Sequence, residues 1–315
     1  MSELGGRLGR RMAAMWRGAA AAMIGACDRA SGAGRTMPMD RTPAPSGDGP
    51  AIEAGRGAGR LAIGLVLALV LGLVPGLRHG AAAADDPKTG DLAAAEALYE
   101  EGEMLAAAEL ARRTGGADGL VLAAKATLVD ALYLADAAVR SQLLERAVAD
   151  ARGALALAPD DEAASLQLAI ALGALADWQG PIAAHLNGSA KEGYELLLRA
   201  RQLAPDDPWP EGLLGIWHLQ IVRHGSAVLA AELYGASADA GLALCRRAAV
   251  LAPEALALRY GCAVSLLEVD PERFGNEALR ALVAILRMPA ADAAERLVQR
   301  AARQQIAAFR QEAAR

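Results

Sequence analysis

Cysteine and histidine are the residues of this chain best suited to nucleophilic or metal-dependent chemistry, and both are scarce. The 315 residues include three cysteines and four histidines. His218 and His224 are six residues apart, which places them on different faces of a helix. They form no HExxH pair, and the sequence has neither a phosphate-binding loop nor a nucleophile-elbow motif. The sequence therefore predicts no enzyme activity, no catalytic residue, no metal site and no cofactor.

Two pairs of aspartates have the appearance of paired catalytic carboxylates. They are Asp160-Asp161 and Asp206-Asp207, and each pair follows a proline directly. Aspartate at the start of a helix accepts hydrogen bonds from backbone N–H groups that have no partner within the helix. Helix capping therefore explains both pairs without catalysis.

The prolines before these aspartates belong to a phrase that occurs three times. Leu-Ala-Pro stands at 157–159, 203–205 and 251–253, with the prolines 46 and 48 residues apart. Each phrase follows a run of small and basic residues that is typical of a helix, and proline ends a helix because it lacks the N–H and clashes with the preceding turn. This period predicts stacked helical repeats, with each phrase at the corner between two antiparallel helices.

Small residues recur at spacings of three and four on both sides of each corner, so that they share one helical face. Gly193, Gly215 and Gly241 are examples in the second and third repeats. Such residues let two backbones approach closely. We therefore expect Gly215 to lie where two helices cross.

These features resemble the tetratricopeptide repeat family. Leu214-Gly215 matches the family's apolar–glycine pair, and Pro159, Pro205 and Pro253 match its closing proline. The resemblance covers 118–290 and implies an all-α fold of stacked antiparallel helix hairpins, forming a short right-handed solenoid. The period exceeds the family's usual one of about 34 residues. The excess predicts long insertions within the repeats, at 177–191 and 224–239.

The resemblance also implies where a ligand would bind. In the family, the first helices of successive repeats line a concave groove, which implies an apolar peptide site. Carried onto this chain, its lining residues are Leu166, Ile170, Trp209, Ile216, Leu219, Tyr260, Val264 and Leu267. The alternative is that the insertions fill the groove, or that the amphipathic carboxy-terminal segment, 291–315, folds back over it as a capping helix.

The amino-terminal part has the pattern of a bacterial export signal. An apolar run at 61–77 follows Arg56 and Arg60 and precedes an Ala-x-Ala site at 82–84. This pattern predicts a signal peptide over 56–84, cut before Asp85, and a periplasmic protein. The alternative is an uncleaved inner-membrane anchor facing the periplasm, because 17 apolar residues reach the lower limit for a membrane span.

The remaining segments are assigned by composition. Residues 1–55 are rich in glycine, alanine, arginine and proline, which is typical of a disordered leader or of sequence upstream of the true translation start. Residues 85–117 are expected to form an amino-terminal helix. Residues 85–315 hold 22 of the 32 basic and 32 of the 37 acidic residues, a net charge of −10. This charge excludes nucleic acid as a partner.

Cys245 and Cys262 lie eight residues before and nine after Pro253, so a hairpin turning there would bring them level. A disulfide between them is one interpretation, since oxidation is permitted outside the cytoplasm. The alternative is that both are small apolar residues buried in a helix seam.

Two functions are consistent with these features. The first is a scaffold or adaptor that binds a cell-envelope protein or peptide. The second is a ligand-binding accessory component of a solute transport system, which would take a small hydrophobic ligand. Membrane contact is expected only if the segment at 61–77 is not cleaved.

Overall fold

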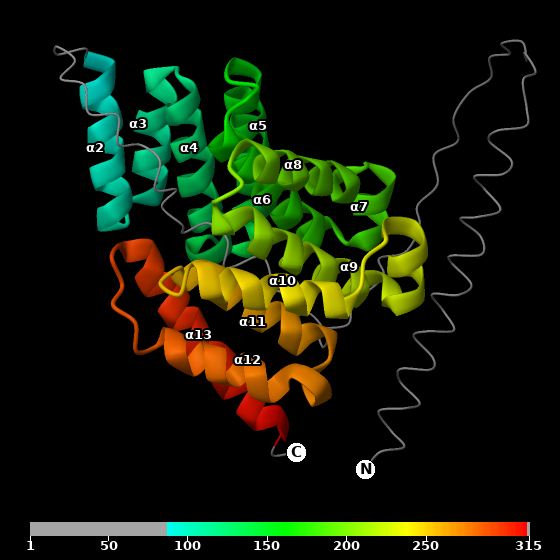
Figure 1. Ribbon diagram of the computed structural model, residues 1–315. Coiled ribbons are helices and arrows are strands. Elements are labelled where there is room, and N and C mark those ends of the chain that lie inside the picture. The colour runs from blue at the N-terminus through cyan, green and yellow to red at the C-terminus, as the bar shows by residue number, and fades with distance from the viewer. Residues whose placement is uncertain (1–86, 314–315) are drawn as a thin grey trace, which may run out of the picture. The chain divides into compact units, whose positions relative to one another are not determined.

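The computed structural model describes residues 87–313, and all of their regular secondary structure is helical (Figure 1). The predicted leader, 1–55, and the whole predicted signal region, 56–84, with its cleavage site, lie outside the described residues. The described part confirms the all-α prediction. Its elements are α2 (Pro87–Glu101), α3 (Met104–Thr114), α4 (Ala117–Val129), the π-helical turn η2 (Asp130–Leu134), α5 (Ala137–Leu157), α6 (Glu162–Gln179), α7 (Pro181–Leu186), α8 (Ser189–Leu203), α9 (Pro208–Tyr234), α10 (Ala238–Leu251), α11 (Leu256–Val269), α12 (Pro271–Ile285) and α13 (Ala293–Ala313).

The helices pack as a succession of hairpins in chain order. The pairs are α4 with α5, α6 with α8, α9 with α10, and α11 with α12 (Figure 1). The amino-terminal region that was expected to be one helix forms two, α2 and α3. Gly102, with a φ of 102°, separates them, and this left-handed conformation suits glycine.

The three Leu-Ala-Pro phrases form three nearly identical corners. The alanines before the prolines, Ala158, Ala204 and Ala252, have φ of −132°, −131° and −132° and ψ of 80°, 79° and 74°. Each of these alanines is the last residue associated with a helix, and a new helix begins within four residues of it. The corner prediction is confirmed.

Aspartates cap the helices that follow two of these corners. Asp161 Oδ1 accepts a hydrogen bond from the backbone N–H of Ala164 at 2.6 Å, and Asp207 Oδ1 accepts one from Trp209 at 2.9 Å. Asp160 has a different role, because it pairs with Arg199 of α8 at 2.7 Å. The third corner has no side-chain cap.

Two glycines form a close helix crossing between α9 and α10. A Cβ atom added to Gly215 would lie 2.9 Å from the carbonyl oxygen of Gly241 and 2.9 Å from Sγ of Cys245. One added to Gly241 would lie 2.7 Å from Cγ of Leu219. Real Cβ atoms essentially never make contacts this short, so the crossing requires glycine on both sides. The position predicted for Gly215 is confirmed.

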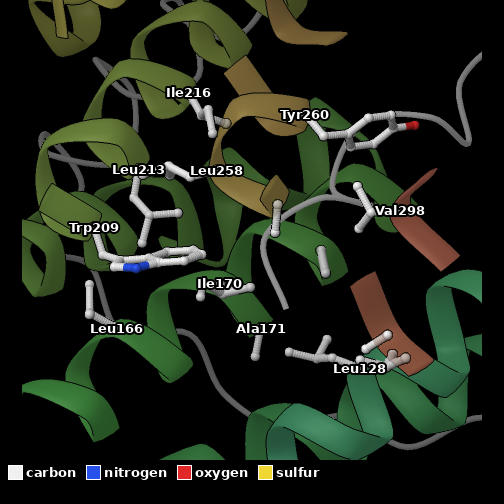
Figure 2. Close-up of a cluster of buried hydrophobic side chains, with 14 of the residues drawn as sticks. Leu128, Leu166, Ile170, Ala171, Trp209, Leu213, Ile216, Leu258, Tyr260 and Val298 are labelled. Carbon is white, nitrogen blue, oxygen red and sulfur yellow. The ribbon is translucent and has the colours of Figure 1, made fainter. Parts of the chain in front are cut away.

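A continuous hydrophobic core runs through the hairpins. Leu128 of α4, Leu213 of α9 and Leu258 of α11 belong to it, and Figure 2 shows them among the buried side chains. Burial of these apolar side chains supplies the main favourable free energy of folding.

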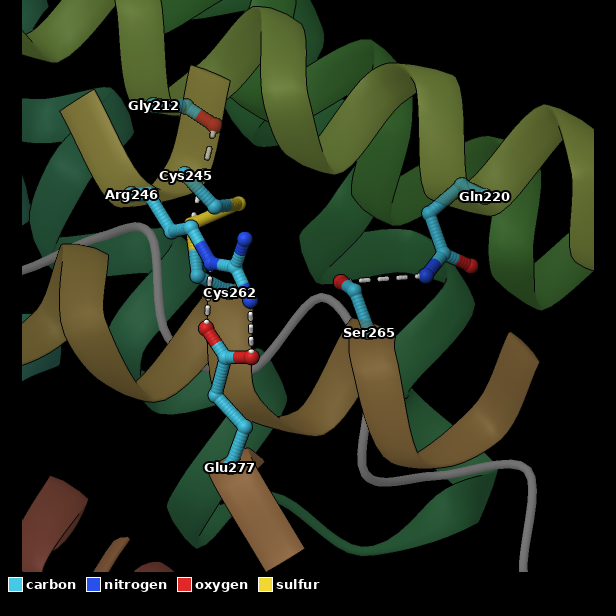
Figure 3. The surroundings of a disulfide bond; sticks show 7 residues. All are labelled: Gly212, Gln220, Cys245, Arg246, Cys262, Ser265 and Glu277. Carbon is cyan, nitrogen blue, oxygen red and sulfur yellow. Dashed lines mark hydrogen bonds and ion pairs between the residues drawn. A yellow bond between two sulfur atoms is a disulfide. The ribbon is translucent and has the colours of Figure 1, made fainter. Parts of the chain in front are cut away.

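Beside the α9–α10 crossing, a disulfide joins Cys245 of α10 to Cys262 of α11 (Figure 3). The Cα atoms of the two cysteines are 5.7 Å apart, and both residues are buried. The turn at Pro253 brings the two cysteines together. Of the two sequence interpretations, the structure therefore matches the disulfide.

Both predicted insertions are helical. Residues 177–191 contain the end of α6 and the short helix α7. Residues 224–239 contain a kink in α9 at Ser226, where φ is 69° and ψ is 160°. The residues after this kink, 227–234, form what we call the α9 hook.

Replacing Gly215 with leucine should lower the free energy of unfolding by about 1–3 kcal/mol, because the side chain would overpack the crossing. Urea denaturation measures this change. Gly173 of α6 is the matched control, since nothing lies within 4 Å of an added Cβ atom there. Gly173→Ala should be neutral or stabilise by up to about 1 kcal/mol. Equal stability of Gly215→Leu and the wild type would contradict the crossing.

Reduction of the disulfide should lower the melting temperature. A cross-link that closes a loop of 17 residues stabilises by about 3 kcal/mol through the entropy of the unfolded chain. Circular dichroism melts with and without a phosphine reductant, after unfolding to expose the sulfur atoms, measure the difference. The double variant Cys245→Ala, Cys262→Ala should melt at one temperature in both buffers, and so should the wild type if the bond does not form.

Candidate functional site

The eight side chains expected to line an open groove are all buried in the hydrophobic core. Trp209 is 6% exposed and Tyr260 is 1% exposed. Figure 2 shows Leu166, Ile170 and Ile216 in the same cluster. Leu219, Val264 and Leu267 are also core residues. In this structure these residues stabilise the fold and present no open surface to a partner.

The carboxy-terminal helix contributes to this burial. Helix α13 packs against α2, α11 and α12, and Figure 2 draws its Val298 in the same cluster as Tyr260 of α11. The start of α13 is fixed by a reciprocal cap, in which Asp292 Oδ1 accepts a hydrogen bond from Glu295 N at 2.7 Å and Glu295 Oε2 accepts one from Ala291 N at 2.6 Å. The structure therefore matches the alternative in which this segment folds back onto the repeats.

A small cavity lies between α10, α11 and α12, against the disulfide. Its volume is about 80 Å³, and its lining includes Leu242, Ala263 and Ala278. Arg246 and Glu277 lie at its edge and form a two-pronged ion pair, with N–O distances of 2.8 and 2.6 Å (Figure 3). Ligand sites in proteins usually measure about 300–1,000 Å³. This cavity is too small for an organic ligand.

Metal-binding geometry is also absent from the described residues. Within 87–313, no group of three or more histidine, cysteine, aspartate or glutamate side chains is arranged to hold an ion. Within the same range no single helix is long and apolar enough to cross a membrane, although the bent pair α9–α10, at 93°, passes that test of length and composition.

The two insertions meet in space, and this was not expected from the sequence. His185 of α7 and Tyr234 of the α9 hook are 49 residues apart, and their side chains share a hydrogen bond of 2.6 Å. Large apolar side chains of the two insertions are exposed, including Leu186 at 73% and Val228 at 65%. We call the exposed apolar residues of the two insertions the insertion surface: Trp178, Ile182, Leu186, Val228 and Leu233.

The insertion surface is almost free of charge. Residues 178–190 contain no aspartate, glutamate, lysine or arginine, and 225–238 contain only Glu232. Elsewhere the chain is rich in such residues, which make up 22% of the whole. Charge depletion together with exposed apolar side chains is the compositional mark of an interaction surface.

Aromatic side chains beneath this surface attach the insertions to the repeats. Trp217 of α9 stacks on Tyr194 of α8, with ring centroids 4.4 Å apart, and its Nε1 donates to the carbonyl of Ala190 at 2.9 Å. Tyr234 of the hook meets Trp217 edge to face at 6.0 Å. His218 accepts a hydrogen bond from Ser237 N at 3.3 Å, and burial lowers the pKa of His218, which favours the neutral ring that can accept.

Four charged or titratable side chains hold the bases of the two insertions together. Arg223 Nη1 of α9 donates to Asp177 Oδ1 of α6 at 3.1 Å, and Arg223 Nε lies 3.2 Å from Glu268 Oε2 of α11. His224 Nε2 lies 3.3 Å from the same oxygen of Asp177. We call Asp177, Arg223, His224 and Glu268 the ionic joint. It connects the first helices of three successive hairpins.

Exposed apolar residues also occur at the proline corners, but in a different setting. Leu157, Leu203 and Leu251 are exposed there. Charged residues surround them, as the Arg199–Asp160 pair and the approach of Arg247 to Glu211 at 3.9 Å illustrate. The corners therefore resemble ordinary solvated surface, and the insertion surface does not.

The sequence located both insertions and offered them as a filling for the groove, but it assigned them no binding role. The absence of charge at 178–190 was readable from the sequence and would have indicated a surface of interest. The pairing of His185 with Tyr234 was not readable, because the two residues belong to different repeats. No protein-family model matches the chain, and no curated protein is significantly similar to it in sequence.

Trp209→Ala should lower the free energy of unfolding by about 3–5 kcal/mol, because it leaves a cavity in the core. Trp178→Ala is the control, since Trp178 is exposed and its clearest contact is with Arg140, 5.6 Å above its ring. That change should cost about 1 kcal/mol or less. Chemical denaturation of the two variants measures both values. Equal, small effects would mean that Trp209 faces solvent.

Proposed function

We propose that this protein is a non-enzymatic periplasmic scaffold or adaptor that binds a protein or peptide of the cell envelope. Its repeats are tetratricopeptide-like hairpins, arranged as a short right-handed solenoid. The observation that carries the proposal is the insertion surface, where two uncharged segments meet and expose Trp178, Leu186 and Val228. We therefore propose the insertions as the binding site, instead of the groove expected from the sequence.

The composition of this surface indicates what it binds. An apolar, almost uncharged surface is matched by an apolar face of similar size, such as one side of an amphipathic helix. Residues 85–315 carry a net charge of −10, so a basic or neutral partner segment approaches more readily than an acidic one. We therefore propose an amphipathic helix with few acidic residues as the segment that docks.

The alternative function, a ligand-binding component of a solute transport system, has weaker support. A small hydrophobic ligand needs an apolar cavity of several hundred Å³. The cavity beside the disulfide measures about 80 Å³. The scaffold is therefore the function that this geometry supports better.

Export to the periplasm is part of the proposal. The signal pattern at 56–84 suggests it, and the Cys245–Cys262 disulfide supports it, because structural disulfides persist in oxidising compartments. An inner-membrane anchor that faces the periplasm would place the repeats in the same compartment.

Introducing charge into the insertion surface should abolish partner binding without unfolding the protein. We expect Leu186→Asp combined with Val228→Asp to weaken binding at least about 30-fold, since central contacts contribute about 2 kcal/mol or more. Both positions are exposed, so the melting temperature should change little. The measurement is capture from envelope extracts, followed by titration of each purified candidate partner.

Leu105→Asp is the matched control. Leu105 lies on α3, away from the insertions in sequence, and is 51% exposed. The control variant should bind each partner as the wild type does. A purified partner that binds the wild type and the double variant with equal affinity would refute this use of the insertion surface.

A further inference from the structure

Ser226 interrupts α9 with a backbone conformation that is costly for serine. Its φ of 69° is the only positive φ of a non-glycine residue within 87–313. Such a conformation costs on the order of 1–3 kcal/mol and persists only where the surrounding structure enforces it. The segment beyond Ser226 is the α9 hook, which carries Val228 and Leu233 of the insertion surface.

The ionic joint lies directly before this kink in the chain. Arg223 and His224 are the third and second residues before Ser226, respectively, and both are held by Asp177 of α6. Arg223 is held from the other side by Glu268 of α11. The side chains of the joint are between 13% and 28% exposed, so water screens their charges poorly.

The charges of the joint do not balance. When both carboxylates are ionised, Asp177 and Glu268 carry two negative charges against the single positive charge of Arg223. A surplus charge in a poorly solvated place is unfavourable. A proton on Glu268 removes the surplus.

We propose that the ionic joint is a proton-operated latch for the α9 hook. When the joint holds its extra proton, the hook stays against α7 and the insertion surface is assembled. When the joint loses that proton, α6, α9 and α11 separate locally, Ser226 relaxes, and the hook leaves α7. The inference rests on the proposed function, since it assigns the regulation of the same surface.

The electrostatics of Glu268 support this direction. Burial raises the pKa of Glu268 to about 8; Arg223 opposes the rise and Asp177 adds to it. In an open, hydrated joint the pKa would return towards the ordinary value of about 4.5. The open form therefore releases its proton first, and the closed form loses stability relative to it as the pH rises from about 4.5 to about 8.

Further polar groups of α9 and α11 lie beside the joint. From α9, Gln220 donates to Ser265 of α11 at 3.2 Å and also accepts from Arg223 at 3.3 Å. On α11 itself, burial and the nearby Glu268 both raise the pKa of Tyr260, so that its hydroxyl stays neutral. Of the two α11 groups, Glu268 is thus the one whose charge changes near neutral pH.

Hydrogen exchange of the full chain, read by mass spectrometry, tests the latch without any partner. Exchange rates are corrected for the intrinsic effect of pH and compared at pH 6 and pH 9. We expect peptides covering 225–238 to exchange at least tenfold faster at pH 9, with a midpoint near the pKa of Glu268. Peptides from α4 and α5 serve as the internal reference and should not change.

Two variants make the test specific. Glu268→Gln keeps the joint neutral, so protection of 225–238 should be retained at pH 9. Asp177→Asn removes a negative neighbour of Glu268, so the midpoint should move to lower pH. Glu195→Gln, at an exposed position of α8, should behave as the wild type. If Glu268→Gln fails to fold, the shift of the midpoint in Asp177→Asn still tests the latch.

The latch is overturned if protection of 225–238 does not depend on pH in the wild type, or if Glu268→Gln opens with pH as the wild type does. Neither result bears on the proposed function, because that proposal is tested by partner binding at pH 6. Conversely, a working latch in a protein whose Leu186→Asp, Val228→Asp variant still binds its partner would leave the latch standing and refute the docking surface.

Discussion

The close approach of neighbouring helices is the constraint on which the rest of this structure depends. At the α9–α10 crossing, Gly215 and Gly241 leave no room for even one Cβ atom. Alanines such as Ala147, Ala151 and Ala248 have almost no exposed surface at other seams. Helices packed through such small residues leave little space between them, which explains why the one cavity described above holds only about 80 Å³. The binding role that we propose is therefore assigned to the outer surface of the hairpins.

The insertions supply that outer surface because their side chains do not have to fit into a close helix crossing. Each extends a repeat beyond the length needed for a hairpin, so its side chains are free of the requirement to be small. Trp178, Leu186 and Leu233 are large and exposed, whereas Trp217 and Tyr234 beneath them form a packed aromatic support. A rigid support of this kind reduces the entropy lost when a partner docks. The ionic joint links α6, α9 and α11 at the bases of the two insertions, and this position is the reason that we propose it as a latch.

Several features of the fold were predictable because they depend on residues close together in the sequence. The Leu-Ala-Pro phrase produces the same backbone angles three times, since helix termination by proline and capping by aspartate act within one turn. The glycine at 215 was predictable for a related reason: spacings of three and four identify a helical face without knowledge of the partner helix.

By itself, then, the sequence determined the all-helical class, the corners, the glycine seam and the positions of the two insertions. The tertiary structure decided whether Trp209 and Tyr260 face solvent, whether Cys245 meets Cys262, and whether α7 touches the α9 hook. These outcomes depend on contacts between distant residues, such as the pair His185–Tyr234 with its separation of 49. An amphipathic pattern shows that a helix has an apolar face, but the same pattern fits an open groove and a filled one. The packing of α13 against α11 distinguishes the two, and it follows from the free energy of the whole core rather than from any local signal.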